Sequence, residues 1–206
     1  MLKLFFFVAL IFGPTFSAPE SSELILQNEV VRCQNNWRSH IARRGHIKGR
    51  NQTAANMREL KYDLELETLA KQFSSNKPLI LSKKDRLNGF TLFHATGFLN
   101  PSALAKADCE NRYSQSYLSK WSPSNLTEPF FNFTGNWFQM IWAKSSRIGC
   151  ASQFYSKNQE HRTILVCKYD VPMEVGKEIF EAGKSCAFCG KMNTRCDNLR
   201  KLCISG

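Results

Sequence analysis

The chain has 206 residues and is basic, with 28 Lys and Arg residues against 17 Asp and Glu residues and a formal net charge of +11. This length suits one globular domain that builds its own core. After the first residues, no apolar run approaches the roughly 18 residues that a membrane-spanning helix needs. We therefore expect a soluble domain with a positively charged surface and without a transmembrane anchor.

The N-terminus shows the parts of a secretory signal peptide. Lys3 gives a basic start, residues 4–12 are apolar, and Thr15 and Ser17 supply small residues at the −3 and −1 positions of a cleavage site. We expect a signal peptide over 1–17 and a secreted, extracellular mature chain. Outside the cell a basic protein meets anionic polysaccharides and lipid headgroups, so we expect no nucleic-acid partner.

Eight cysteines in an exported chain predict a disulfide framework. Four of them fall in a C-terminal stretch with few apolar side chains, which needs bridges of its own to hold its shape. The sequence therefore divides into a globular domain over 18–185 and a disulfide-stapled, hinge-like tail over 186–206. Eight cysteines permit 105 pairings, and the residues alone do not select one.

Three stretches show helix signals, namely polar caps and apolar side chains that recur every three or four residues. They cover residues 24–44, 54–74 and 100–119. Ser21 or Ser22 caps the first helix, Gly45 ends it, and Pro101 stands at the first position of the third helix. The segment 83–97, which contains two glycines, is predicted to be irregular.

Strand signals appear late in the chain. Residues 148–155 and 162–169, joined by a polar segment, predict a β-hairpin. A helical turn or two is predicted over 138–143. The stretch 122–135 before it combines turn formers with three phenylalanines, which predicts an aromatic loop.

Four segments, taken in order, resemble motifs of the secreted CAP superfamily, which includes cysteine-rich secretory proteins, antigen 5 allergens and pathogenesis-related proteins. They are Gln34-Asn35-Asn36-Trp37-Arg38, Ala54 to Leu66, Gly135 to Trp142 with Ile148 to Ala151, and Leu165 to Tyr169. The resemblance implies an α+β fold: a three-layer α-β-α sandwich with a central antiparallel sheet and a short cysteine-rich extension. The glycine spacing from Gly45 to Gly49 resembles venom allergen-like members of parasitic worms.

The resemblance also implies how the cysteines pair. It joins Cys150 to Cys167 across the two late strands and pairs Cys33 with Cys109. The four tail cysteines then form two bridges among themselves. They are Cys186, Cys189, Cys196 and Cys203.

Family members with an intact cleft hold two His and two Glu that bind a divalent metal, and this ligand set suits zinc. Matched segment by segment, the four positions are Leu81, Phe90, Glu110 and Asn136. Three of them have lost their ligand chemistry, so we expect a degenerate tetrad with no metal, no cofactor and no catalytic residue. A metal-dependent hydrolase is the least favoured hypothesis, although a Ser-His-Asp site stays open because such sites are spatial.

Phe131, Phe133 and Phe138 match the spacing of the caveolin-binding-like motif that sterol-binding family members carry. Aromatic rings on an exposed loop can cover the flat face of a sterol, and each contributes roughly 1.5 to 3 kcal/mol when fully buried. The alternative is that these rings fill the core. Glycosylation sequons begin at three asparagines, which are Asn51, Asn125 and Asn132.

Two hypotheses of different classes follow. The first is a secreted, non-enzymatic protein that binds a sterol or a fatty acid at a host or other extracellular interface. The second is an interaction protein that binds a host cell-surface protein or a glycosaminoglycan through its basic surface and tail.

Overall fold

The computed structural model describes residues 21–47, 50–76, 80–118, 135–157 and 160–205. The predicted signal peptide, the rings of Phe131 and Phe133, and the sequons at Asn125 and Asn132 lie outside these residues. Within the described ranges, no helix combines the length and apolar character needed to cross a membrane.

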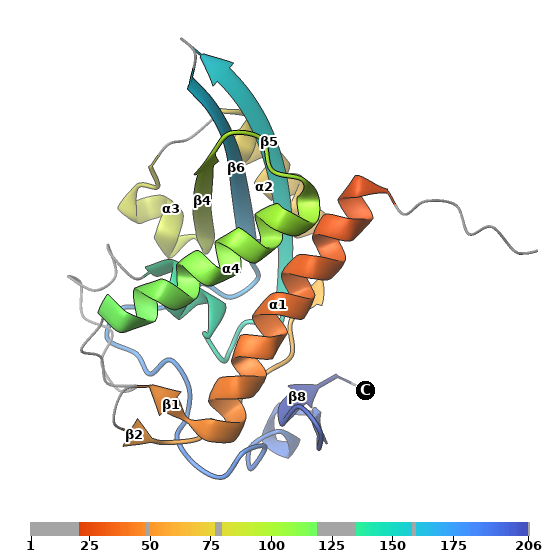
Figure 1. Cartoon of the computed structure of the whole chain (residues 1–206). Helices are drawn as coiled ribbons and strands as arrows, with labels where there is room; N and C mark the ends of the chain where they lie inside the picture. The colour runs from red at the N-terminus through yellow and green to blue at the C-terminus, as the bar shows by residue number, and fades with distance from the viewer. Residues whose placement is uncertain (1–20, 48–49, 77–79, 119–134, 158–159, 206) are drawn as a thin grey trace, which may run out of the picture.

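A four-stranded sheet lies at the centre of the molecule, with helices on both of its faces (Figure 1). Its strand order is β3 (Lys61–Tyr62), β5 (Arg147–Lys157), β6 (Glu160–Tyr169) and β4 (Phe90–Thr96). The pairs β5–β6 and β6–β4 are antiparallel, whereas the short edge strand β3 runs parallel to β5. The expected α+β sandwich is confirmed, but its sheet is mixed at one edge, because the chain enters α2 by running alongside β5.

The helices form the outer layers. Helices α1 (Ser22–Arg44) and α4 (Pro101–Leu118) cover one face, and α2 (Leu64–Ser75) packs on the other. The short α3 (Lys83–Leu87) lies beside the edge strand β4. Close approach of α2 to β5 requires Gly149, since a Cβ there would meet the Glu67 backbone nitrogen at 2.0 Å.

The first predicted helix is confirmed at both ends. The Ser21 side chain accepts a hydrogen bond from the Leu24 backbone N–H, and Gly45 closes the helix in the left-handed conformation at φ 57°. The buried face differs from the expected apolar stripe, because Leu24 is 43% exposed while Arg38 is fully buried. Arg38 donates to several backbone carbonyls, including that of Met140 at 3.0 Å, and so satisfies its charge inside the protein.

The predicted helix over 54–74 is wrong in its first half. Residues 54–60 are not helical but bend at 55–56, and the chain becomes helical only at α2, where the Asp63 side chain accepts from two backbone N–H groups. This irregular segment bonds to the end of the chain, with Ala55 N donating to Glu181 O and Glu59 N to Cys203 O. Distant backbone partners therefore override the local helix pattern.

The irregular segment predicted over 83–97 is also wrong. It contains α3, which begins with a capping box between Ser82 and Asp85, and all seven residues of β4, which pair with β6. The two glycines, Gly89 and Gly97, have positive φ and flank the strand rather than interrupt it. The strand forms because β6 supplies a continuous hydrogen-bonding edge.

Three further predicted elements are present, whereas nearly all of the aromatic loop predicted over 122–135 lies outside the described residues. The Asn100 side chain accepts from the Ala103 backbone N–H and caps α4. The late hairpin pairs from Ile148 with Tyr169 out to Lys157 with Glu160. Residues 135–140 are helical, so this turn begins three residues earlier than expected.

Two disulfides join the pairs that the family resemblance implied, Cys33–Cys109 and Cys150–Cys167. The tail closes with two bridges as expected, and the structure gives their pairing, which the sequence left open, as Cys186–Cys196 and Cys189–Cys203. The first ties α1 to α4, the second ties β5 to β6, and the last two close the tail.

The C-terminal tail packs against the globular domain. It contains a 3-10 turn, η1 (Gly190–Met192), and a small antiparallel pair, β7 (Arg195–Asp197) and β8 (Leu202–Ile204). Leu202 is fully buried in the same cluster as Trp142. A second small pair follows α1, formed by β1 (His46–Ile47) and β2 (Arg50–Asn51).

Asp63 yields a prediction about stability and pH. Its pKa is lowered by the hydrogen bond from the Leu66 backbone and by Arg147, whose Nη1 lies 2.7 Å from Oδ2, although burial opposes this. Replacing Asp63 with Ala removes the helix cap and should lower the free energy of unfolding by about 1 kcal/mol in urea denaturation.

The Asp63→Asn variant separates the cap from the charge, because Asn still accepts the capping bonds. A lowered carboxyl pKa stabilises the fold above the unfolded value and loses that effect as pH falls through the folded value. The wild type should therefore exceed Asp63→Asn in stability at neutral pH, with the difference vanishing in acid. A difference independent of pH would contradict the role of the carboxylate.

Candidate functional site

The four positions matched to the family's metal ligands do not form a ligand cluster. Leu81 is buried and apolar, and Phe90 stacks on Phe73 with ring centroids 4.5 Å apart. The Glu110 side chain is 70% exposed on α4, where it lies 3.9 Å from Lys106. Asn136 is buried, and its Nδ2 donates to the carbonyl of Leu92 in the edge strand β4 at 2.8 Å.

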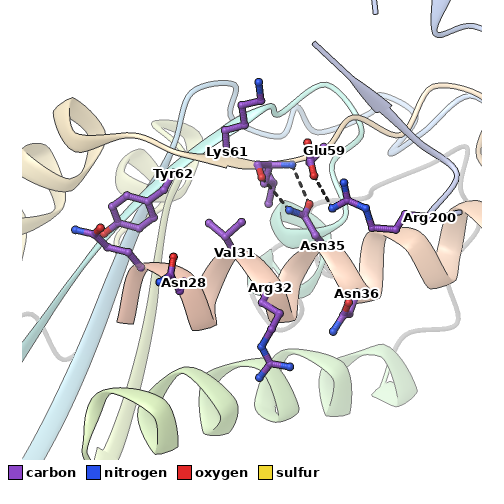
Figure 2. Close-up of a pocket in the computed structure, with 11 residues that line it drawn as sticks. Asn28, Val31, Arg32, Asn35, Asn36, Glu59, Lys61, Tyr62 and Arg200 are labelled. Atoms are coloured by element: carbon purple, nitrogen blue, oxygen red, sulfur yellow. Dashed lines mark hydrogen bonds and ion pairs between the residues drawn. The ribbon is translucent and has the colours of Figure 1, made fainter. Parts of the chain in front are cut away.

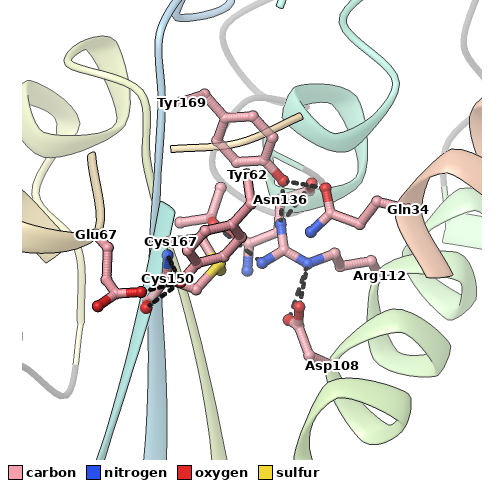
Figure 3. Close-up of a disulfide and its surroundings, with 10 residues drawn as sticks. Gln34, Tyr62, Glu67, Asp108, Arg112, Asn136, Cys150, Cys167 and Tyr169 are labelled. Carbon is pink, nitrogen blue, oxygen red and sulfur yellow. Dashed lines mark hydrogen bonds and ion pairs between the residues drawn. A yellow bond between two sulfur atoms is a disulfide. The ribbon is translucent and has the colours of Figure 1, made fainter. Parts of the chain in front are cut away.

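The carboxylate that lies near Asn136 is Asp108, one half-turn before Glu110 on α4. It forms an ion pair with Arg112, whose Nε lies 2.8 Å from both carboxylate oxygens (Figure 3). The Arg112 side chain is fully buried, and that of Asp108 is 2% exposed. A salt bridge inside the protein therefore lies beside Asn136, whose carbonyl accepts from Arg112.

Three other parts of the fold bind the same guanidinium. Arg112 Nη2 donates to Thr91 Oγ1 on β4 at 3.0 Å. Arg112 Nη1 lies 3.2 Å from the carbonyl of Asn136 and 3.4 Å from the hydroxyl of Tyr169 on β6. Tyr169 in turn donates to Gln34 Oε1 on α1 at 2.7 Å. One buried cation thus links α4, both sheet strands at this edge and α1.

The charges around Arg112 favour its protonated, cationic form. Burial lowers the pKa of Arg112, but attraction to Asp108 and Tyr169 outweighs it and leaves the pKa raised. Burial also raises the pKa of the Asp108 carboxyl, although Arg112 lowers it. Because Nε contacts both carboxylate oxygens at 2.8 Å, we take the pair as ionised at neutral pH.

A second cation lies at the same edge of the sheet. Arg86 of α3 is half-buried, and its Nη1 is 3.5 Å from Asn136 Oδ1. Burial lowers its pKa, and the nearby Asp85 only partly offsets this. Two guanidinium groups therefore lie around Asn136, the position that the motif comparison matched to a family histidine.

These residues do not fit the family's divalent metal. Among the described residues, no three His, Cys, Asp or Glu side chains gather as a ligand group. The buried Gln34 Nε2 has no partner within the described ranges, but it is a donor and suits an acceptor atom rather than a cation. A metal ion would also meet the fixed charge of Arg112, and like charges repel strongly in a dry interior.

Sequence reasoning missed Asp108, Arg112 and Tyr169. Asp108 and Arg112 have the i, i+4 spacing of a helical ion pair, which is a usable signal. The exposed pair Lys106 and Glu110 has the same spacing on the same helix, however, so spacing does not tell which pair is buried.

The aromatic motif is only partly described. Phe138 is fully buried in the cluster that contains Ile41 and Trp142, so its ring fills the core. For Phe138, the core position corresponds to the alternative given in the sequence analysis, in which these rings fill the core instead of contacting a ligand. Phe131 and Phe133 lie outside the described residues, and the sequon residue Asn51 lies in β2.

The family is shown by direct comparison. The model of the CAP cysteine-rich secretory protein family matches residues 31–169, more than half of the chain. The chain belongs to the CAP family. Its fold is similar to that of NaASP2 solved with Zn2+, at 22% identity and a TM-score of 0.74, covering 91% of this chain and 100% of that one. BmVAL-1 gives 23% identity and a TM-score of 0.74, covering 88% and 95%.

Curated relatives carry venom allergen and inhibitor names. Venom allergen 5 of Lycosa singoriensis is 30% identical over 190 residues, which are 85% of this chain and 48% of the relative. Peptidase inhibitor 16 of Homo sapiens is 30% identical over 144 residues, which are 66% of this chain and 30% of the relative. The chain thus spans less than half the length of either protein. Venom and secretory relatives, together with four disulfides, fit an extracellular protein.

The buried ion pair predicts an unequal response to two carboxylate substitutions on one helix. Asp108→Ala leaves Arg112 as an uncompensated buried charge and should lower the free energy of unfolding by about 3 to 5 kcal/mol. Glu110→Ala removes the exposed pair and should change it by no more than about 0.5 kcal/mol. Urea denaturation measures both, and equal losses would show that the buried pair does not hold the cleft together.

The same geometry predicts that zinc does not stabilise the protein. A site filled to 100 times its dissociation constant would add about 2.7 kcal/mol to the free energy of unfolding. We expect the melting temperature to be the same in zinc, in magnesium and in chelator. A saturable rise specific to zinc would contradict the loss of the metal site.

Proposed function

We propose that this CAP protein is a secreted, non-enzymatic binding protein whose ligand is a sterol or a fatty acid. The observation that supports the non-enzymatic part is the buried Arg112–Asp108 pair, which places hydrogen-bonded groups without solvent exposure beside Asn136. A side chain that is fully bonded and closed to water has no free proton or lone pair to give to a substrate.

The lipid part rests on the aromatic motif. With Phe138 in the core, Phe131 and Phe133 are the two rings left to contact a ligand. Two rings buried against a sterol contribute about 3 to 6 kcal/mol, and 6 kcal/mol corresponds to a dissociation constant of about 40 µM. Tighter binding requires further apolar contacts beside this loop.

Two other assignments belong to the same proposal. The signal peptide over 1–17 directs the chain to the secretory pathway, where the four disulfides form. The division into a domain over 18–185 and a tail over 186–206 is supported by the two bridges that close within the tail. Contacts such as Ser39 Oγ to the Arg200 carbonyl at 2.7 Å support a tail fixed to the domain.

Binding of labelled cholesterol by purified protein tests the proposal. Replacing both Phe131 and Phe133 with Ala should weaken saturable binding by about tenfold or more, since it removes most of the aromatic contact. The matched control is Phe98→Ala with Phe154→Ala, because these rings are 70% and 47% exposed and lie outside the aromatic motif.

The control variant should bind like the wild type. Absence of saturable binding, or equal binding by both double variants, would overturn the lipid proposal. Cholesterol and palmitate measured side by side decide between a sterol and a fatty acid.

A further inference from the structure

A trough runs along the side of α1 that faces residues 59–62 and the tail. Two adjoining cavities of about 570 and 430 Å³ lie along it, and Asn36 and Arg200 line both of them. The α1 residues that line the trough run from Gln27 to Arg43, a length of about 24 Å at 1.5 Å per residue. The site is therefore elongated.

The floor of the first cavity is built from amide groups. Asn35 Nδ2 donates to the Leu60 carbonyl at 2.8 Å, and Asn35 Oδ1 accepts from the Leu60 N–H at 2.9 Å, which fixes the side chain (Figure 2). Further amides line the trough at Gln27, Asn28 and Asn36. Amides both donate and accept hydrogen bonds, so this lining matches a ligand rich in hydroxyl groups.

The rims of this cavity are cationic. Figure 2 shows Arg32 extending from α1 on one side and Lys61 extending from the 59–62 segment on the other. Lys61 is exposed and forms no ion pair with the described residues. Arg43, which lines the second cavity, is likewise exposed and unpaired within the described ranges.

Carboxylates neutralise the other two cations of the trough. Arg32 pairs with Glu29, and Arg200 pairs with both Glu59 and Asp197. The uncompensated charge thus lies at Lys61 and Arg43, toward different ends of the trough. Charge spread along a line suits an extended anion better than a compact one.

Aromatic side chains complete the walls. Trp37 lines the second cavity and stacks on Tyr113 with ring centroids 3.9 Å apart, so its ring is held in place. Tyr62 lines the first cavity, and its hydroxyl is fixed by Glu67 and the Cys150 carbonyl. Fixed aromatic surfaces offer apolar contact without a large loss of side-chain entropy.

We propose that this trough binds an anionic polysaccharide, a sulfated or carboxylated chain of the glycosaminoglycan type. Its amides take the hydroxyl groups, its cationic rims take the acidic groups, and its length accommodates several sugar units. An acidic peptide fits less well, because peptide interfaces depend on apolar anchors in deep pockets and the aliphatic lining here is limited to Val31, Leu60 and the exposed Leu199. The proposal goes beyond lipid binding and does not depend on it.

Calorimetric titration with a heparin-derived oligosaccharide of defined length tests this site. The double variant Arg43→Ala with Lys61→Ala should weaken binding by about tenfold at physiological salt. The matched control, Lys106→Ala with Lys144→Ala, removes the same charge from lysines that are 76% and 54% exposed outside the trough. It should weaken binding by no more than about twofold, because only long-range attraction is lost.

Three results would overturn the proposal. Equal losses in the two double variants would show that the net charge, and not the trough, binds the chain. Absence of binding at about 0.15 M salt would show that attraction is fully screened. Equally tight binding of a polyglutamate peptide would assign the trough to acidic peptides instead.

Discussion

The buried pair of Arg112 and Asp108 is the interaction on which the cleft depends. A guanidinium without water costs several kcal/mol unless each of its donors finds a partner. Its partners come from α4, from Thr91 on β4, from Tyr169 on β6 and from the backbone at Asn136. These elements must therefore keep their positions for the charge to remain hydrogen-bonded.

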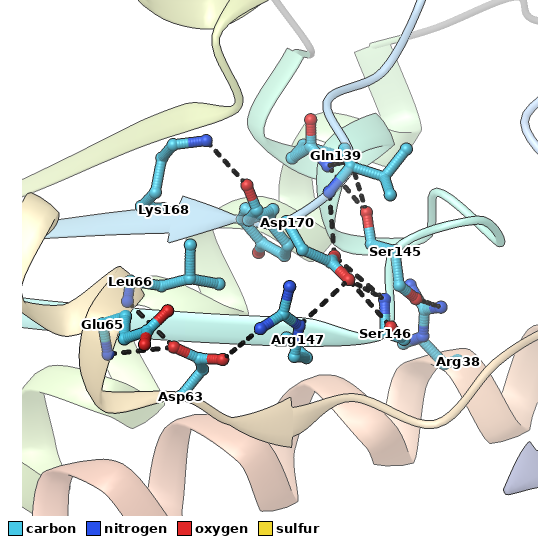
Figure 4. Close-up of polar contacts among 12 residues, drawn as sticks. Arg38, Asp63, Glu65, Leu66, Gln139, Ser145, Ser146, Arg147, Lys168 and Asp170 are labelled. Carbon is cyan, nitrogen blue, oxygen red and sulfur yellow. Dashed lines mark hydrogen bonds and ion pairs between the residues drawn. The ribbon is translucent and has the colours of Figure 1, made fainter. Parts of the chain in front are cut away.

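Arg38 organises the opposite side of the core by the same means. Its guanidinium donates to the carbonyl of Arg58 and to backbone carbonyls of residues 140–145 (Figure 4), and it forms no ion pair with the described carboxylates. Burial lowers its pKa to about 10, so it remains charged at neutral pH. Arg38 thus holds irregular backbone that sheet or helix hydrogen bonds alone would leave unpaired.

The sequence predicted correctly the helix ends that capping residues determine. Both ends of α1 and the start of α4 follow from Ser21, Gly45 and Asn100, because a capping residue acts within one turn of the helix. Segment 54–60 and strand β4 were missed because their hydrogen-bond partners, the chain around Cys203 and strand β6, lie more than 60 residues away. Helix propensity is a weak preference that such tertiary contacts readily override.

The sequence indicated little of what the candidate site contains. The family motifs suggest Leu81, Phe90 and Asn136 as lost ligands, and this interpretation stays a prediction. That Asp108 rather than Glu110 is buried beside Arg112 depends on the rotation of α4, which the Cys33–Cys109 bridge and the sheet fix. The sequence also does not tell which basic residues are exposed. Some arginines are buried inside the fold, whereas others, such as Arg43, face solvent.

A crystal structure of the protein grown in zinc tests the central claim most directly. The account predicts that Arg112 still lies between Asp108 and the Asn136 carbonyl and that no metal is bound beside them. A zinc ion at Asn136, with the guanidinium displaced, would contradict it.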